Sequence, residues 1–129
     1  DFSVELKELK AEARTGRADE GERCRAAEAK RLRAALPVGS AVVALDERGK
    51  EMDSDQLAGF IELRANESTR QVVFLIGGAF GLDQTVLQRA NYRWSLSKLV
   101  FPHQLVRLIL TEQLYRACTI IRNEKYHHR

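Results

Sequence analysis

Three glycines follow one apolar run, and their spacing suits a ligand-binding turn. Residues Val72 to Ile76 are apolar and rich in β-branched side chains, which predicts a buried strand, and Gly77, Gly78 and Gly81 come just after it. Glycine lets backbone N–H and C=O groups approach a ligand with no Cβ in the way. We therefore expect a small-molecule site at the carboxyl end of this strand, although such turns also use glycine for purely local reasons.

Basic residues gather in two parts of the chain. The first group, between positions 12 and 33, is mixed with acidic residues and is typical of a solvated helix face. The second group has fewer acidic neighbours and comprises Arg89, Arg93, Lys98, Arg107, Arg116, Arg122 and Lys125. We expect phosphate contacts from this second group, with ordinary surface charge as the alternative. The net charge of +3 permits an anionic partner without requiring one.

Strand and helix patterns alternate along the N-terminal half and would position these groups. Apolar residues alternate with polar ones over positions 2–6, which predicts a strand with one buried face. After a loop at Thr15–Asp19, strong helix formers predict a helix from about Glu20 to Leu36. A short apolar strand is expected at Ala41–Leu45, with its turn at residues 46–50.

Three capping signals organise the rest of the chain. Asp53 or Ser54 can cap one helix, Asp83 can cap the next, and Pro102 suits the first turn of a final helix. Between the last two helices, Trp94 to Phe101 predicts another strand. Strands alternating with helices indicate an α/β fold, with a mostly parallel sheet and helices on both faces. Ligands of such sheets bind beyond the carboxyl ends of the strands.

The final helix is apolar on more than one side. Its apolar residues are Leu105, Val106, Leu108, Ile109, Leu110, Leu114, Tyr115, Ala117, Cys118, Ile120 and Ile121. A small domain offers a core to only one side of such a helix, so a partner subunit is expected to cover the rest. The sequence therefore predicts a homodimer.

Composition excludes several classes of protein. A length of 129 residues suits one domain spanning 1–129, and no apolar segment approaches the roughly 18 residues of a membrane span. Without a signal-peptide pattern, we expect a cytoplasmic protein with no membrane partner. Cys24 and Cys118 lack a CxxC spacing, so we expect unpaired thiols and no metal site. No GxGxxG follows a strand, which disfavours a Rossmann-type methyltransferase or NAD enzyme.

Several motifs of the C-terminal half occur in the order found in one enzyme family. They are IGGAFGLD, NYRWSLSKLVFPHQLVRLILTEQLYRACTII and the terminal KYHH. In these motifs the chain resembles the RlmH family of SPOUT-class methyltransferases, which modify a pseudouridine of large-subunit ribosomal RNA. The resemblance implies transfer of a methyl group from S-adenosylmethionine to ring nitrogen N3, on the assembled ribosome. It also implies a C-terminal trefoil knot. Members of the family usually open with a further strand and helix, and we expect these to be absent from this chain.

The same resemblance implies where the methyl donor binds. The expected contacts are Leu45, Gly77, Leu96, Ser97, Lys98, Leu99, Val100 and Phe101. A flat adenine can lie between apolar side chains while loop backbone groups bind its edge. Leu96 and Leu99 could instead be buried in the hydrophobic core, which is the more common role of leucine.

The C-terminal motifs offer the groups for methyl transfer. Methylation of a ring nitrogen needs an aligned methyl group and removal of an imide proton, for which His127, beside Tyr126, is the expected acceptor. Arg116 is expected to reach RNA phosphate or the partner's site, oriented by Glu112, although residues at this spacing also form simple surface ion pairs. His103 is expected to pack or form a hydrogen bond at the start of the final helix, with a catalytic role as the alternative.

Two other functions remain open from the sequence. One is a ribosome-associated RNA-binding or assembly factor that has the fold without catalysis. The other is a nucleotide-binding regulatory module that uses the GGAFG turn to hold phosphate.

Trp94 is expected to be buried against the final helix, with stacking on an RNA base as the alternative.

Overall fold

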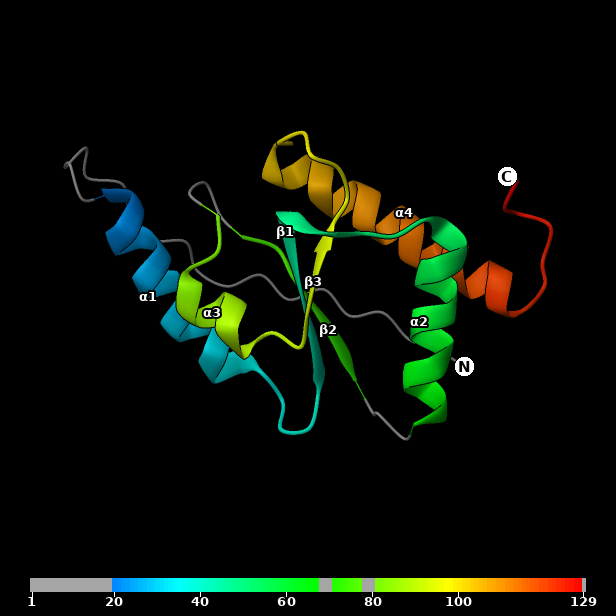
Figure 1. The fold of residues 1–129 in the computed structure, drawn as a ribbon, viewed down its shortest axis with the longest axis horizontal. Coiled ribbons are helices and arrows are strands. Elements are labelled where there is room, and N and C mark those ends of the chain that lie inside the picture. The colour runs from blue at the N-terminus through cyan, green and yellow to red at the C-terminus, as the bar shows by residue number, and fades with distance from the viewer. Residues whose placement is uncertain (1–19, 68–70, 78–80, 129) are drawn as a thin grey trace.

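The structure, a computed structural model, describes residues 20–67, 71–77 and 81–128. The strand expected over positions 2–6 and the loop at Thr15–Asp19 lie outside the described residues. The elements are α1 (Glu20–Ala35), β1 (Ala41–Glu51), α2 (Ser54–Asn66), β2 (Val72–Leu75), α3 (Gln84–Arg89), β3 (Tyr92–Ser95) and α4 (His103–Ile121) (Figure 1).

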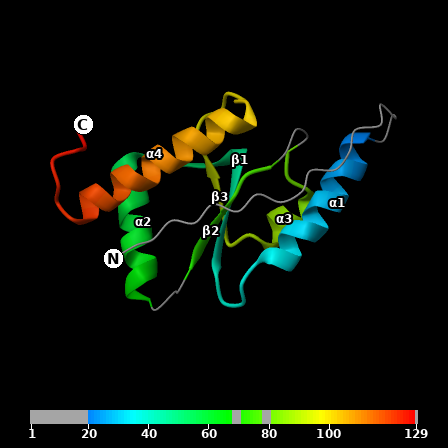
Figure 2. The same cartoon turned by 180° about the vertical axis from the view of Figure 1, so that it is seen from behind.

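The three described strands form one parallel sheet with β1 in the middle. Its order is β2-β1-β3, with Ala41 opposite Val72 and Val43 opposite Tyr92. Both views show α2 and α4 on one side of the sheet and α1 and α3 on the other (Figures 1 and 2). The predicted α/β class, with a parallel sheet covered on both faces, is confirmed; the trefoil knot stays a prediction.

Neighbouring residues of β1 serve two separate cores because successive strand side chains point to opposite faces. Val43 packs in a cluster with residues of α2 and α4, whereas Val42 packs in another with Ala29 of α1 and Val86 of α3. Trp94 belongs to the first cluster, where it lies with Leu110 of α4. The expected burial of Trp94 against the final helix is therefore confirmed.

The predicted turn at residues 46–50 is wrong, because β1 continues to Glu51. Leu45 and Lys50 both pair with Trp94, so the intervening residues bulge out of the ladder between β1 and β3. A Cβ at Gly49 would lie 2.8 Å from the carbonyl carbon of Arg93. The glycine that marked a turn in the sequence instead allows two strands to approach closely.

The predicted strand from Trp94 to Phe101 is too long, because β3 ends at Ser95. Local hydrogen bonds take over there: Ser95 Oγ donates to the carbonyl oxygen of Ser97, and the N–H of Leu99 donates to Ser97 Oγ. Such side-chain bonds to nearby backbone compete with the sheet ladder. Residues 96–101 are therefore a loop.

The predicted helix starts are confirmed. Asp53 forms a capping box with Gln56, and Asp83 accepts from the N–H of Thr85 at 3.0 Å. Hydrogen bonds from Thr85 are the main reason that the pKa of Asp83 lies below its usual value. Pro102 directly precedes α4 as its cap residue instead of lying within its first turn.

Other expectations concern thiols, metals and membranes. Cys24 and Cys118 are free thiols, as expected. Among the described residues, no group of three His, Cys, Asp or Glu side chains is placed to hold a metal ion. Across the same part of the chain, every helix is too short or too polar to cross a membrane.

Candidate functional site

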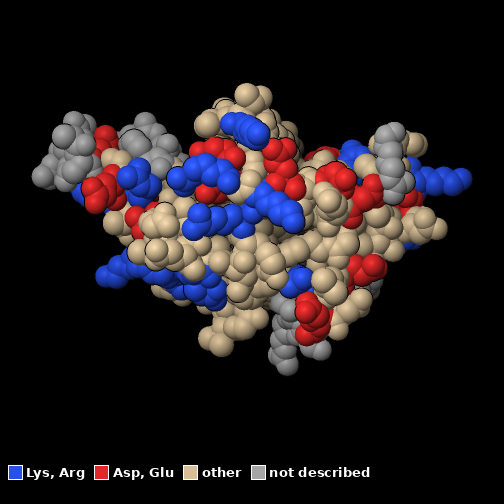
Figure 3. All heavy atoms as spheres, in the orientation of Figure 1, with Lys and Arg blue, Asp and Glu red and all other residues tan. Residues whose placement is uncertain are grey.

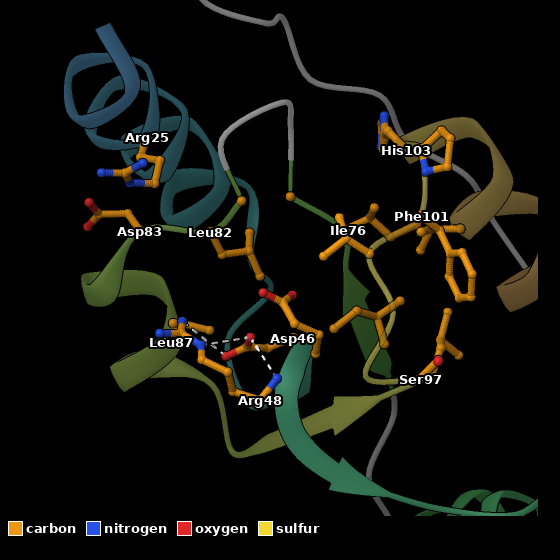
Figure 4. A pocket seen from close by; sticks show the side chains of 18 of the residues that line it. Arg25, Asp46, Arg48, Ile76, Leu82, Asp83, Leu87, Ser97, Phe101 and His103 are labelled. Atoms are coloured by element: carbon orange, nitrogen blue, oxygen red, sulfur yellow. Dashed lines mark hydrogen bonds and ion pairs between the residues drawn. The ribbon is translucent and has the colours of Figure 1, made fainter. Parts of the chain in front are cut away.

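A cavity of about 860 Å³ lies at the carboxyl end of β2, beside the bulged part of β1 (Figure 4). The loop after β3 and the start of α4 complete its wall. Predicted donor-binding residues that line it are Leu45, Gly77, Leu96, Ser97, Leu99, Val100 and Phe101. Lys98 is exposed and does not line it. The fold thus brings together three segments that are separated in the sequence.

The glycine turn has a local geometric requirement as well as a place on the cavity wall. A Cβ at Gly77 would lie 2.7 Å from the carbonyl carbon of Gly81 and 2.9 Å from the nitrogen of Leu82. Gly81 has a φ of +80°, a conformation that disfavours other residues. The backbone of the turn therefore passes so close to Gly77 that there is no room for a side chain, which is a purely local reason for glycine at this position. Gly78 lies outside the described residues.

The leucines of the loop after β3 have different surroundings. Leu96 packs against the core cluster that contains Trp94. Leu99 and Val100 are 68% and 81% exposed, so the interpretation of Leu99 as a core residue is wrong. An apolar, exposed loop beside a cavity is suited to contact a flat ligand.

Two charged residues on the cavity wall were missed by the sequence analysis. The side chain of Asp46 is only 4% exposed, and its Oδ1 lies 3.2 Å from Nε of Arg48, whose side chain is 70% exposed. The N–H of Arg48 also donates to Oδ1. The hydrogen bond and the charge of Asp46 raise the pKa of Arg48. Their spacing of two residues would indicate a shared strand face, but this segment was interpreted as a turn.

Arg116, Tyr126 and His127 form a second cluster, at the C-terminal end of α4. Nη2 of Arg116 and the hydroxyl of Tyr126 each donate to Oε2 of Glu112 at 2.9 Å. Nη1 of Arg116 lies 3.0 Å from Nδ1 of His127, and Nε2 of His127 lies 3.9 Å from Oδ2 of Asp55. The structure therefore joins the three predicted catalytic residues and docks the tail on α4.

Charge pairing sets the protonation states in this cluster. The hydrogen bond from Arg116 is the main reason that the pKa of Glu112 is lowered, and Tyr126 adds to the effect. The hydrogen bond to Glu112 raises the pKa of Tyr126. At neutral pH, Glu112 is thus an anion and Tyr126 keeps its proton. Tyr126 consequently acts as a hydrogen-bond donor and not as a base.

The cavity is lined by residues at the start of α4, whereas the C-terminal cluster lies near the other end of this helix. The cavity is lined by His103 and Val106 at the start of this helix, so His103 is a wall residue as well as the first residue of α4. From His103 to Arg116 the axial rise is about 20 Å, at 1.5 Å per residue. One chain therefore does not bring the predicted donor site and the predicted catalytic residues together.

Comparisons with known proteins identify the family. Residues 1–127 match the family described as "Predicted SPOUT methyltransferase". A protein from Syntrophotalea carbinolica is 48% identical over 126 residues, which cover 98% of this chain and 78% of that protein. One from Paraburkholderia xenovorans is 47% identical over 128 residues, covering 98% and 80%. One from Nitratidesulfovibrio vulgaris is 50% identical over 101 residues, covering 78% and 65%.

All three relatives carry the name "Ribosomal RNA large subunit methyltransferase H". In two of them the aligned region covers 98% of this chain. The motif order that suggested this family and the parallel α/β sheet agree with the match. This chain belongs to the SPOUT methyltransferases and, within them, to the ribosomal RNA large subunit methyltransferase H family.

Proposed function

We propose that this protein transfers a methyl group from S-adenosylmethionine to N3 of a pseudouridine in large-subunit ribosomal RNA. The observation that carries the proposal is the cavity at the carboxyl edge of the sheet, where nearly all the expected donor contacts lie together. The names of the relatives support a ribosomal RNA substrate. We expect such an enzyme to work in the cytoplasm on the assembled ribosome.

The cavity wall fits the chemistry of the donor. Apolar side chains of Leu96 and Phe101 can hold a flat adenine, and Gly77 leaves backbone exposed beside it. When bound, S-adenosylmethionine supplies an electrophilic methyl group on a sulfonium. The contribution of the protein is then mainly orientation, which can supply a large part of the rate enhancement.

A homodimer would complete the site. Leu105, Leu108 and Tyr115 are exposed apolar residues on α4, and together they offer a surface for a second copy of the chain. Because about 15 Å of helix separates Val106 on the cavity wall from Arg116, the catalytic residues would have to come from the partner. We propose that each donor cavity works with the C-terminal tail of the other subunit.

Proton removal requires a rearrangement of the tail. Arginine has only donors, so Nδ1 of His127 accepts from Arg116 and the neutral ring carries its proton on Nε2. In this arrangement His127 has no free lone pair for the imide proton of the base. We propose that the contact between Arg116 and His127 opens when RNA binds, which frees Arg116 for phosphate and His127 for the proton.

The charged surface is compatible with RNA. Lys and Arg side chains lie together across the middle of the face in Figure 3, with Asp and Glu side chains beside them. Within the second basic group, Arg116 and Arg122 are paired with Glu112 and Glu124. Arg89, Arg93 and Lys98 are exposed, and we propose them as phosphate contacts.

Calorimetry and a methylation assay test the proposed function. S-adenosylmethionine and S-adenosylhomocysteine are expected to bind the full chain, and ATP is not. Labelled methyl groups should enter large-subunit RNA of ribosomes that lack the modification. Binding to ribosomes without binding the donor would instead indicate an assembly factor, and binding of ATP alone would indicate a nucleotide-binding regulator.

A mixing experiment tests the composite site, in which the donor cavity of one subunit works with the C-terminal tail of the other. A His127→Ala chain and a Phe101→Ala chain are mixed after each has been purified and shown to be folded. If the cavity of one subunit uses the tail of the other, some mixed dimers contain one intact site, so the mixture is more active than the sum of its parts. Purely additive activity would show that each chain works alone.

A further inference from the structure

Asp46 is a buried carboxylate on the cavity wall with no role in the function proposed above. Figure 4 shows it on the wall of the cavity, with dashed lines to Arg48. Of the other described acidic residues that line the cavity, Glu22 and Glu47 are exposed, and Asp83 accepts hydrogen bonds from Thr85. Among the described acidic residues of the cavity wall, Asp46 is thus the buried carboxylate that a backbone hydrogen bond holds in place.

The position of this charge is held by the fold. Asp46 follows Leu45 on the central strand, where β1 begins to bulge away from β3. Oδ1 of Asp46 accepts from the backbone N–H of Arg48 at 3.2 Å, which orients the carboxylate locally. A carboxylate removed from water is costly unless a cation or hydrogen-bond donors compensate it. The charge therefore favours a cationic ligand group in the cavity.

The partner of Asp46 in the structure is replaceable. Arg48 approaches the carboxylate with Nε at 3.2 Å and Nη2 at 3.4 Å, longer than a strong charge-assisted bond. Its side chain is 70% exposed, so it can turn into solvent at little cost. A ligand cation can take its place beside Asp46 without leaving Arg48 buried and unpaired.

We infer that Asp46 is the counter-charge for the sulfonium of the methyl donor, and that Arg48 pairs with Asp46 before the donor binds and after it reacts. The inference rests on the proposed function. Methyl transfer converts the sulfonium to a neutral thioether, so the product no longer attracts Asp46 while Arg48 still does. Asp46 therefore makes the site prefer the donor to its product and favours release of S-adenosylhomocysteine.

Calorimetry on the full chain, with S-adenosylmethionine and S-adenosylhomocysteine as the two probes, tests this assignment. Asp46→Asn keeps the shape and the oxygen that accepts from the N–H of Arg48, but removes the charge. It should weaken donor binding about 10- to 100-fold, less than the full attraction between two close charges because Arg48 competes for Asp46 in the free chain, and leave product binding nearly unchanged. Glu51→Gln, an exposed acid on the same strand, is the control for net charge and should change neither affinity.

The outcomes separate the inference from the function on which it rests. Equal weakening of both ligands by Asp46→Asn, or no change in either, would overturn the assignment to the sulfonium. If the wild-type chain bound neither ligand, the proposed function itself would fail, and the inference with it. If Asp46→Asn does not fold, Arg48→Gln decides: it should raise the ratio of donor to product affinity, and an unchanged ratio would overturn the inference.

Discussion

Arg116 and His127 are joined by a hydrogen bond of 3.0 Å in which the guanidinium donates to Nδ1 of the imidazole. The bond connects the C-terminal part of the final helix to the tail, eleven residues later. Glu112 supports it, since its carboxylate accepts from both Arg116 and Tyr126. The tail is thereby held in one position, with the basic nitrogen of His127 engaged.

The first prediction concerns His127 as the proton acceptor. His127→Ala should slow methyl incorporation into ribosomes by about 100- to 10,000-fold, the usual range for lost general-base catalysis. Donor affinity should stay the same, because the side chains that line the donor cavity are unchanged in this variant. His128→Ala, an exposed neighbour, is the matched control and should remain active. Equal losses of rate and donor affinity would instead assign His127 to the donor site.

The second prediction concerns the dimer. Leu108 is 66% exposed on α4, and a charge there would be trapped in an apolar interface. Leu108→Glu should therefore give a monomer by light scattering at micromolar concentration, whereas the wild type should give a dimer. Leu63→Glu alters an exposed leucine of α2 and should leave the dimer intact. A monomeric wild-type chain would contradict the composite site.

The third prediction concerns the glycine turn. A methyl group at Gly77 would overlap the backbone of Gly81, so Gly77→Ala should destabilise the fold by about 1–3 kcal/mol and weaken donor binding. At Gly59 of α2 there is open space for a Cβ, and Gly59→Ala should stabilise by about 0.5–1 kcal/mol. Thermal denaturation measures both changes. A Gly77→Ala chain as stable as the wild type would show that the turn relaxes easily.

The fourth prediction concerns the pH dependence of the docked tail. The pKa of Glu112 is lowered, chiefly by its hydrogen bond with Arg116. A lowered folded-state pKa means that the stabilisation is present above the ordinary glutamate pKa and is lost as the pH falls through the lowered value. The tail should thus remain docked at neutral pH and detach in acid below about 4.5, followed by NMR signals of Tyr126. Glu112→Gln should remove this acid transition.

Local sequence patterns determined the order and most of the boundaries of the elements. Asp53 and Asp83 were predicted to start helices because a short carboxylate can bond to free N–H groups in the first turn, and both do so. The apolar run before Gly77 predicted a strand for a similarly local reason. The order of the motifs along the chain also indicated the family, and most of the expected donor contacts lie within two of these motifs.

Only the tertiary structure decided what depends on residues far apart in the sequence. Pairing with β3 continues β1 through the predicted turn, where Gly49 lies close to Arg93, and Asp46 and Arg48 of this segment line the cavity. The length of α4 likewise separates Arg116 from the cavity, although both had been assigned to one reaction. Periodicity reports which face of an element is apolar, but only packing between elements determines which side chains meet in space.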